Sequence, residues 1–522
     1  MLKKLLIIII AACLAGVALA LVVALTDSQR LAENSVQSID QEAQRHTPKF
    51  VNIASKLGLP ATERGVNCSA NSAAVAWIDL DRQGGPELIL GSYTGWTTIW
   101  QVDSQSAEPI ANLGLIPSAT GLAVADYDND GWDDLLVSTQ KGARLYNNRS
   151  GRLVDVTASS GIKPHKLGMT AAWGDMNRDG LLDLALTQGN NCANSGPKRG
   201  FHFGQPRLYL QTSAGRFRQS HDLLAEPVRP ALGQAVGWTD LNDDGWLDLY
   251  FANDNIAGAD NQAWRNEKGK LVPGFKSSEI GINSMGLGLG DLNRDSRMDL
   301  AISNIAPVNT LINKGTRFQR DRLQAYSYNH LPITWGLIVE DFNNDGWEDI
   351  WSAAGGLEGQ GGKNYPVFFL NLGPDRDLID VGKFSGIKKR WRGRSPAIAD
   401  LNNDGLMDLV MASLNDKPAF FINKGSAIKG NWLNIRLEGN PALNSPRSAC
   451  GARAWLTVKK ITWMREMGCG SEGFLSSSER MLHFGTGNLA GSGRLKIRWP
   501  GGQAESHQVN LNSEYSFVQQ GP

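Results

Sequence analysis

Residues 240–249 read Asp-Leu-Asn-Asp-Asp-Gly-Trp-Leu-Asp-Leu, and this stretch decides the fold because its pattern recurs along the chain. Aspartate stands at the first position, aspartate or asparagine at the third, aspartate at the fifth, glycine at the sixth and aspartate at the ninth. Seven copies follow one another at intervals of 47, 49, 65, 51, 50 and 59 residues. A period of this length indicates stacked supersecondary units.

The copies share oxygen-bearing residues at positions 1, 3, 5 and 9, although the first copy is degenerate. These candidate metal ligands are Asp79, Asp81 and Glu87; Asp126, Asp128, Asp130 and Asp134; Asp175, Asn177, Asp179 and Asp183; Asp240, Asn242, Asp244 and Asp248; Asp291, Asn293, Asp295 and Asp299; Asp341, Asn343, Asp345 and Asp349; and Asp400, Asn402, Asp404 and Asp408.

This spacing predicts a tight loop that binds a hard cation. Four side-chain oxygens and a backbone carbonyl near position 7 supply about six donors, which suits Ca2+. Histidine and cysteine are absent from the loops, which argues against zinc and copper. The twelfth position lacks the glutamate of an EF-hand, so the ninth-position aspartate should close the site.

A single copy could be a solvated turn, but seven copies in register favour metal, because clustered carboxylates repel one another without a cation. We expect up to seven Ca2+ sites. The first copy has Gln83 and Glu87 in place of aspartates, and the fifth has Ser296 in place of glycine. These two sites should be the weakest or empty.

Each repeat predicts four short strands: one entering the loop, one leaving it, a third that ends in asparagine, and a fourth such as Leu153 to Thr157. Four strands per repeat correspond to one propeller blade. The sequence therefore predicts an all-β fold with a seven-bladed β-propeller at residues 48–425.

The seventh repeat lacks a fourth strand, whereas Phe50 to Ala54 precedes the first loop without a repeat of its own. Its pattern, Phe-Val-Asn-Ile-Ala ending in Gly58, matches Leu-Val-Asp-Val-Thr ending in Gly161 in the second repeat. We predict that Phe50 to Ala54 completes the last blade and closes the ring, since an open edge would otherwise be exposed.

Residues 431–518 alternate apolar and polar residues in short runs broken by glycine and proline, which favours a small C-terminal β-sandwich. Its Arg-Trp pairs could form a ligand face, or they could be strand edges with solvated arginines.

The N-terminus (residues 1–26) predicts a signal anchor or signal peptide, followed by a polar stalk at residues 27–47. Lys3 and Lys4 precede the 21 uncharged residues Leu5 to Leu25, which reach about 31 Å as a helix, enough to cross a bilayer. Cleavage after Ala20, or a lipoprotein signal at Cys13, are the alternatives. All three export the chain, so we expect an extracytoplasmic protein that is secreted or faces the periplasm or exterior from one membrane helix.

Composition limits the function. The 52 lysines and arginines balance the 52 aspartates and glutamates, so the sequence lacks the basic footprint of a nucleic-acid-binding protein. The seven histidines are scattered without HExxH or another metal-ligand spacing, and the sequence has no GxSxG elbow or P-loop, so catalysis has little support. The 65-residue interval contains a Gly-, Asn- and aromatic-rich insertion at residues 190–204, which could carry function or be a decorative loop.

The repeats resemble FG-GAP or VCBS repeats, the calcium-loop blades of integrin alpha-chain propellers. Residues 431–518 resemble the ASPIC and UnbV domain of cartilage-acidic-protein-like proteins; the resemblance rests on Asn431-Trp-Leu-Asn-Ile-Arg-Leu, Gly451-Ala-Arg, Arg465-Glu-Met, Leu482-His-Phe-Gly and Ile497-Arg-Trp-Pro-Gly-Gly. It implies a calcium-loaded binding, adhesion or scaffold protein outside the cytoplasm, and no known reaction.

Two function classes follow. The first is a module that binds a protein or polysaccharide partner through the loops opposite the metal loops, and the second is a glycan-acting enzyme with its site on that same face. In an oxidising compartment we also predict the disulfides Cys68–Cys192 and Cys450–Cys469.

Overall fold

The computed structural model of the chain describes most of the sequence. It describes residues 41–60, 73–91, 96–115, 119–139, 141–163, 168–193, 200–220, 222–226, 229–254, 260–275, 284–304, 308–315, 317–320, 332–356, 362–414, 416–470 and 473–521. No helix in these ranges is long and apolar enough to span a membrane. The predicted signal or anchor at residues 1–26 lies outside them.

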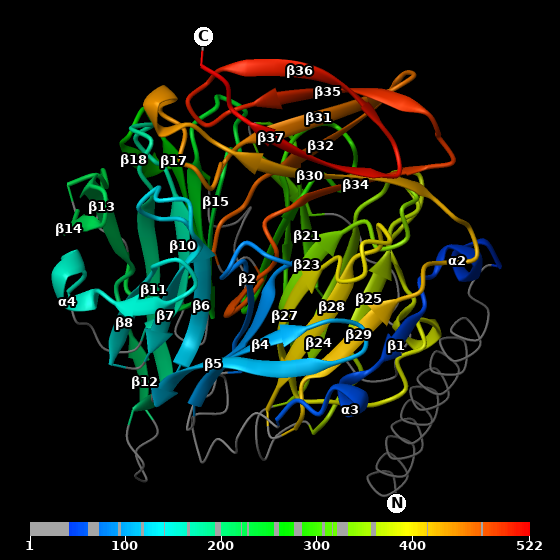
Figure 1. Cartoon of the computed structure of the whole chain (residues 1–522), viewed down its shortest axis with the longest axis horizontal. Coiled ribbons are helices and arrows are strands. Elements are labelled where there is room, and N and C mark those ends of the chain that lie inside the picture. Colours follow the sequence, from blue (N-terminus) through cyan, green and yellow to red (C-terminus); the bar gives the residue numbers. More distant parts are fainter. Residues whose placement is uncertain are drawn as a thin grey trace, which may run out of the picture.

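Seven sheets of four or five strands form the propeller, one sheet for each repeat (Figure 1), and the strands that each repeat contributes pair antiparallel. From the axis outward, blades 1 to 4 are β2 (Val75–Ile78), β3 (Glu87–Leu90), β4 (Trp96–Val102) and β5 (Ala107–Leu115); β6 (Ala119–Ala125), β7 (Asp134–Thr139), β8 (Gly142–Asn148) and β9 (Leu153–Asp155); β10 (Gly168–Gly174), β11 (Asp183–Ala193), β13 (Arg207–Ser213) and β14 (Arg216–Gln219), with β12 (Gly200–Phe203) on β11; and β15 (Leu232–Thr239), β16 (Asp248–Asp254), β17 (Gln262–Asn266) and β18 (Leu271–Pro273).

Blades 5 and 6 follow the same order, and blade 7 takes its outer strand from the N-terminal region. Their strands are β19 (Leu287–Gly290), β20 (Asp299–Ile302), β21 (Asn309–Asn313) and β22 (Phe318–Arg320); β23 (Thr334–Glu340), β24 (Asp349–Ala354), β25 (Val367–Leu370) and β26 (Ile379–Asp380); and β27 (Gly393–Ala399), β28 (Asp408–Ser413), β29 (Ala419–Asn423) and β1 (Phe50–Asn52).

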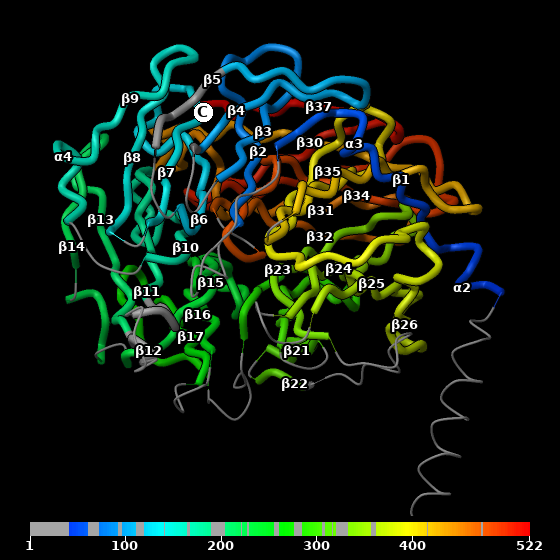
Figure 2. Tube along the Cα trace, turned by 90° about the horizontal axis from the view of Figure 1, so that it is seen from below, coloured from blue at the N-terminus to red at the C-terminus, as the bar shows by residue number. Residues whose placement is uncertain are grey.

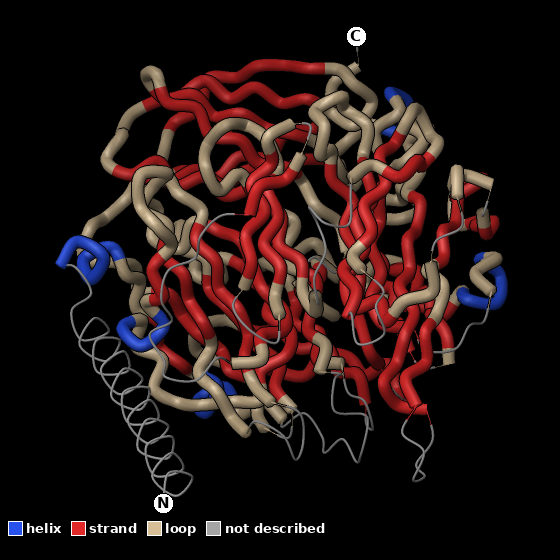
Figure 3. Tube along the Cα trace, turned by 180° about the vertical axis from the view of Figure 1, so that it is seen from behind, coloured by secondary structure: helices blue, strands red, loops and turns tan. Residues whose placement is uncertain are grey.

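The innermost strands close the ring. Each of β2, β6, β10, β15, β19, β23 and β27 contacts the next, and β27 contacts β2 again. Figure 2 shows the blades arranged around this ring, with the C-terminal strands behind them. In the described ranges, the helices are few and short and lie at the periphery (Figure 3). Because both faces of each inner strand pack against neighbouring blades, strands such as β6, β15 and β27 are buried along their whole length rather than at alternate residues.

The predicted ring closure is confirmed. Strand β1 pairs antiparallel with β29, with Phe50 opposite Asn423 and Asn52 opposite Phe421. The strand ends at Asn52, however, and the predicted end residue Ala54 begins the short helix α3 (Ala54–Leu57). Blade 2 shows the same arrangement, in which α4 (Thr157–Ser160) follows β9 and ends at a left-handed glycine, Gly161.

The end of the predicted stalk contacts the propeller. Residues 41–46 form helix α2 (Gln41–His46), whose Ala43 is buried among side chains of blades 6 and 7. His46 Nδ1 lies 2.9 Å from Asp345 Oδ2 in the sixth repeat, and Arg376 pairs with Glu42 at 2.8 Å. These residues therefore bind blade 6, rather than serving as a spacer.

The C-terminal residues form two sheets around their own core. One contains β30 (Asn431–Glu438), β34 (Leu482–Gly487) and β37 (Ser513–Val518), and the other contains β31 (Arg453–Val458), β32 (Ile461–Glu466), β35 (Ser492–Arg498) and β36 (Ala504–Asn510). The predicted Cys450–Cys469 disulfide is present and flanks the β31–β32 pair. The predicted Cys68–Cys192 pair involves residue 68, which lies outside the described ranges.

A segment of this C-terminal region enters the axis of the propeller, which the sequence analysis did not foresee. Strand β33 (Ser476–Ser477) pairs in parallel with β2, Gly473 exchanges two backbone hydrogen bonds with Leu287 of blade 5, and the Glu479 N–H donates to Ile398 O of blade 7. Phe474 is fully buried against Trp335, with ring centroids 5.6 Å apart. The C-terminal region is therefore part of the propeller core.

We predict that Phe50→Ala lowers the free energy of unfolding by about 3–5 kcal/mol, the usual cost of removing a buried aromatic side chain. Phe50 is 3% exposed and packs on Phe342, Phe368 and Phe421 with centroids 5.9–6.2 Å apart. Urea denaturation measures the change.

The matched control is Val51→Ala on the same strand, since Val51 is 48% exposed and should contribute little. Equal stability of the two variants, or a chain begun at residue 60 that is as stable and monomeric as one begun at residue 41, would show that β1 does not close the ring.

Candidate functional site

The seven repeat motifs lie at the same end of their blades, each between the innermost strand and the next. We name them loops 1 to 7 in chain order: residues 79–87, 126–134, 175–183, 240–248, 291–299, 341–349 and 400–408. In every loop the residue at position 4 is left-handed, with φ between 51° and 62°, and so is the residue at position 6, with φ between 65° and 95°. Glycine accepts this conformation at no steric cost. Ser296 adopts it too, which a side chain disfavours.

The carboxylates organise each loop through backbone hydrogen bonds. In loop 4, Asp240 Oδ1 accepts from the Asp244 N–H at 3.1 Å and Oδ2 from the Gly245 N–H at 2.8 Å. Asn242 Oδ1 also accepts from Asp244, and Asp248 Oδ2 accepts from the Leu241 N–H at 2.9 Å. Loops 2, 3, 5, 6 and 7 repeat the bonds to the first and third residues. The sequence-predicted residues therefore converge on one loop in each of these repeats.

Loop 1 brings its acids together differently. Asp79 Oδ1 accepts from the Arg82 N–H at 2.7 Å, and Glu87 Oε2 accepts from the Leu80 N–H at 2.7 Å. Asp79, Asp81 and Glu87 nevertheless each offer a carboxylate oxygen within 4.8 Å of the other two, as Asp126, Asp128 and Asp130 do in loop 2. Loop 1 thus retains a cation-sized group of acids despite its degenerate sequence.

Most of these carboxylates are buried. The first-position aspartates of loops 2 to 7 are at most 6% exposed and the ninth-position aspartates at most 1%. Burial is the largest cause of their raised pKa values, and neighbouring carboxylates raise them further. The pKa rises to about 7 for Asp126, Asp175, Asp291 and Asp400, and to about 8 for Asp248, Asp299 and Asp408.

Ionised carboxylates at such sites need a compensating cation. Two loop carboxylate oxygens, Asp349 Oδ2 and Glu87 Oε1, are buried and have no hydrogen-bond partner among the residues that the structure describes. The donors are all hard oxygens, and no histidine or cysteine belongs to a loop. The residues present therefore fit a calcium-type ion.

A buried amide joins each of six loops to the blade before it, a role that the sequence analysis did not assign. The Asn313 N–H donates to Asp299 Oδ1 at 2.7 Å, while its Nδ2 donates to Leu241 O in loop 4 and to Met298 O in its own loop. The equivalent side chains, each with an amide bond to the preceding loop, are Asn148, Gln211, Asn266, Asn371 and Asn423. Their recurrence after the third strand was the available signal.

In four repeats, the side chain at loop position 4 donates a hydrogen bond to the next loop. Arg82 donates to Gly131 O, and Arg178 donates to Gly245 O. Asn129 Nδ2 donates to Gly180 O at 2.9 Å, and Asn344 Nδ2 donates to Gly405 O at 2.8 Å. The acceptor is in each case the carbonyl of the position-6 glycine, so the shape of one loop depends on its neighbour.

The C-terminal region covers these loops (Figure 1). Fully buried Arg453 pairs with Glu466 at 2.6 Å and with Asp243 at 2.9 Å, and Arg498 Nη2 lies 2.8 Å from Asp240 Oδ2. Asn434 Nδ2 donates to Asp400 Oδ2 at 3.1 Å. The arginines, which sequence reasoning left as a ligand face or as solvated strand edges, therefore bind loops of the propeller.

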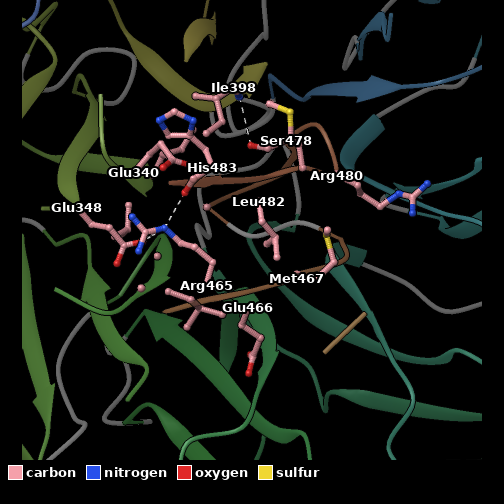
Figure 4. Close-up of a pocket in the computed structure, with 18 of the residues that line it drawn as sticks. Glu340, Glu348, Ile398, Arg465, Glu466, Met467, Ser478, Arg480, Leu482 and His483 are labelled. Carbon is pink, nitrogen blue, oxygen red and sulfur yellow. Dashed lines mark hydrogen bonds and ion pairs between the residues drawn. The ribbon is translucent and has the colours of Figure 1, made fainter. Parts of the chain in front are cut away.

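Further contacts fix the C-terminal region over loop 6. Trp463 Nε1 donates to Gly346 O at 3.0 Å, and His483 Nε2 lies 2.7 Å from Asn344 Oδ1. Arg465 lies between His483 O, at 2.9 Å, and Glu348, at 3.2 Å, beside a cavity of about 110 Å³ (Figure 4). Burial, together with Arg465, lowers the pKa of His483 to about 3, so this histidine is neutral.

In several loops, the backbone N–H of the first loop residue donates a hydrogen bond to a glutamate carboxylate. Asp240 donates to Glu466 and Asp400 to Glu479, both from the C-terminal region, while Asp291 donates to Glu348 of the next loop. Each of these three acids also pairs with an arginine of the C-terminal region: Arg453, Arg436 and Arg465 respectively. The same three buried glutamate side chains therefore bind both the start of a loop and an arginine of the C-terminal region.

Comparisons with known proteins agree with this architecture. The FG-GAP-like repeat model matches residues 126–186, 240–302 and 341–432, and the ASPIC and UnbV model matches residues 442–521. Cartilage acidic protein 1 of Xenopus tropicalis is 23% identical over 512 residues, which cover 90% of this chain and 76% of that protein. Integrin alpha-3 of Cricetulus griseus is 30% identical over 122 residues, covering 21% of this chain and 11% of the integrin.

Among solved structures, an Agrocybe aegerita lectin that recognises non-reducing terminal N-acetylglucosamine is 14% identical, with a TM-score of 0.39. The match covers 70% of this chain and 88% of the lectin chain. The blade count here comes from the sheet order and not from that likeness. The chain therefore contains FG-GAP-like repeats, which here form a β-propeller. It carries a C-terminal ASPIC and UnbV domain and is similar over most of its length to cartilage acidic protein 1.

We predict that Asn313→Ala destabilises the protein by roughly 2 kcal/mol or more, because it leaves the buried carbonyls of Leu241 and Met298 without donors. Chemical denaturation measures the loss. Asn510→Ala is the control, since Asn510 is exposed and the structure gives its side chain no hydrogen bond. A change no larger than that of the control would contradict a structural role for the buried amides.

Proposed function

We propose that this protein is an extracytoplasmic, calcium-binding β-propeller that acts as a binding, adhesion or scaffold module for a protein or polysaccharide partner. The observation that carries the proposal is the set of interlocked loops with buried carboxylates, all at one end of the blades. Such carboxylates fit calcium, and a cation bound only in the native state stabilises that state. The metal would be structural: it would hold the blades in place for a partner.

Three further observations support export and binding. The run from Leu5 to Leu25 after Lys3 and Lys4 has the composition of a signal anchor. The Cys450–Cys469 disulfide suits an oxidising compartment. The similarity to integrin alpha-3 and to cartilage acidic protein 1 supports a binding module rather than an enzyme.

The C-terminal domain leaves two places for a partner. It covers loops 2, 4, 6 and 7 through Ser448, Arg453, Trp463 and Asn434. In the described part of the chain the sheets of this domain lie at the loop end of the blades, away from their opposite ends (Figure 1), and a cleft lined by both parts of the chain lies beside loop 1. A partner bound at either place would leave the buried loop network intact.

We predict that removing calcium with a chelator lowers the melting temperature of the full chain markedly, and that adding calcium restores it. One site at 100-fold excess over its Kd contributes about 2.7 kcal/mol. Asp126→Ala or Asp244→Ala should reduce this calcium-dependent shift more than Asp79→Ala or Asp295→Ala, measured by scanning calorimetry.

Each pair removes the carboxylate at the same loop position, the first for Asp126 and Asp79 and the fifth for Asp244 and Asp295. The quantity compared is the calcium-dependent part of the shift, because Asp126 is buried and Asp79 is exposed, so their losses of total stability differ for other reasons. A chain purified without metal whose melting temperature does not respond to added calcium would refute the proposal.

A further inference from the structure

We propose that the cleft between loop 1 and the C-terminal domain binds an acidic sugar, such as a uronate unit of a polysaccharide. The cleft has a volume of about 600 Å³, and its lining includes Trp77, Asp79 and Arg82 of blade 1 together with Arg436, Ser516 and Val518 of the C-terminal domain. This volume lies within the range of about 300–1,000 Å³ found for small-ligand sites. The inference rests on the proposed function, because it takes loop 1 to hold a cation.

Loop 1 is the open member of the set. Asp79 is exposed and lines the cleft, whereas the first-position aspartates of the other six loops are at most 6% exposed. In zinc proteins, structural sites are closed by protein ligands whereas catalytic sites keep one position open, and the same geometric reasoning applies to loop 1. A cation held by Asp79, Asp81 and Glu87 would therefore be within reach of a molecule in the cleft.

Two buried polar atoms at this place have no hydrogen-bond partner among the described residues. Glu87, which belongs to the loop 1 group of acids, is 0% exposed, and its Oε1 has no hydrogen-bond partner. Trp77 lines the cleft, is 2% exposed, and its Nε1 has no acceptor. Buried polar groups normally have a hydrogen-bond partner. A cation could bind Glu87 Oε1, and an oxygen of a ligand could accept from Trp77 Nε1.

The cationic groups of the cleft point to the same ligand chemistry. Arg82 donates to Gly131 O and lies over the Trp132 ring at 5.1 Å, but within the described part of the chain it has no carboxylate partner. Arg480, which pairs with Asp133, also lines the cleft, and its Nε has no acceptor. A ligand that satisfies these donors must be rich in oxygen, and Arg82, which has no carboxylate partner in the described residues, favours a ligand with a carboxylate.

An acidic sugar fits these requirements better than a protein does. The core of a protein interface is about 65% apolar. Of the four large hydrophobic residues exposed in the described ranges, Val518 alone lines the cleft. Most other charges there are already paired, as Arg436 is with Glu479 and Glu514. A uronate offers a carboxylate and several hydroxyl oxygens within one ring, which matches the clustered donors.

The test is calorimetric titration of the full chain with a galacturonate tetramer in the presence of calcium. We expect binding that is lost on chelation, at least tenfold weaker in Arg82→Gln and several-fold weaker in Trp77→Phe. Arg178→Gln is the matched control. Arg178 makes the same bond to the next loop's glycine and lies over Trp246 at 4.3 Å, but it is not among the residues that line the cleft. This variant should bind as the native chain does.

The inference is overturned if Arg82→Gln and Arg178→Gln bind the tetramer equally, or if a neutral galactose tetramer binds as tightly. An acidic glutamate hexapeptide that binds as well as the galacturonate tetramer would assign the cleft to protein instead. The calcium-dependent melting shift of Arg82→Gln is measured in parallel. If that shift persists while the native chain fails to bind the tetramer, the cleft assignment fails and the calcium proposal stands.

Discussion

The structure depends on carboxylates buried at one end of every blade. The first- and ninth-position aspartates of loops 2 to 7 are nearly inaccessible to solvent, and burial raises their pKa values, to about 8 for Asp248. An ionised group at such a site is costly unless a cation or several donors compensate it. The loops supply the donors as backbone N–H groups, and their remaining oxygens suit a metal ion. The loops and the C-terminal domain therefore place hydrogen-bond donors and arginines beside these buried carboxylates.

Because the loops are linked to one another, each carboxylate affects more than its own blade. Asn313 holds the loop 4 backbone at Leu241 O while its own N–H holds Asp299 of loop 5. The C-terminal domain joins the same network, since Arg453 contacts Asp240 O and Asp243 of loop 4. Its axial segment reaches β2, Leu287 and Ile398 from inside the ring. The propeller is therefore held together at three distances from its axis: by strand β1 at the outside, by the linked loops, and by the C-terminal segment at the axis.

Features with a local sequence signature were predictable, and those that depend on the ring were not. The repeat spacing gave seven blades, and the match between Phe50-Val-Asn and Leu153-Val-Asp located the closing strand. The Cys450–Cys469 pair followed from two cysteines flanking one strand pair. Three features join residues that are far apart in sequence: the axial position of Ser476, the buried contacts of Arg453 and the bridge made by Asn313. Sequence periodicity does not indicate contacts of this kind. The exposure of Asp79 likewise depends on where the C-terminal domain docks.

The central claim is that metal at the loops holds adjacent blades together, and native-state hydrogen exchange with and without calcium tests it most directly. Each bridging amide lies on the third strand of one blade or directly after it, and bonds the loop of the blade before it. Chelation should therefore reduce protection at the loop peptides and at the β17, β21 and β29 peptides together. Lost protection confined to the loop peptides, with the third strands unchanged, would contradict the account.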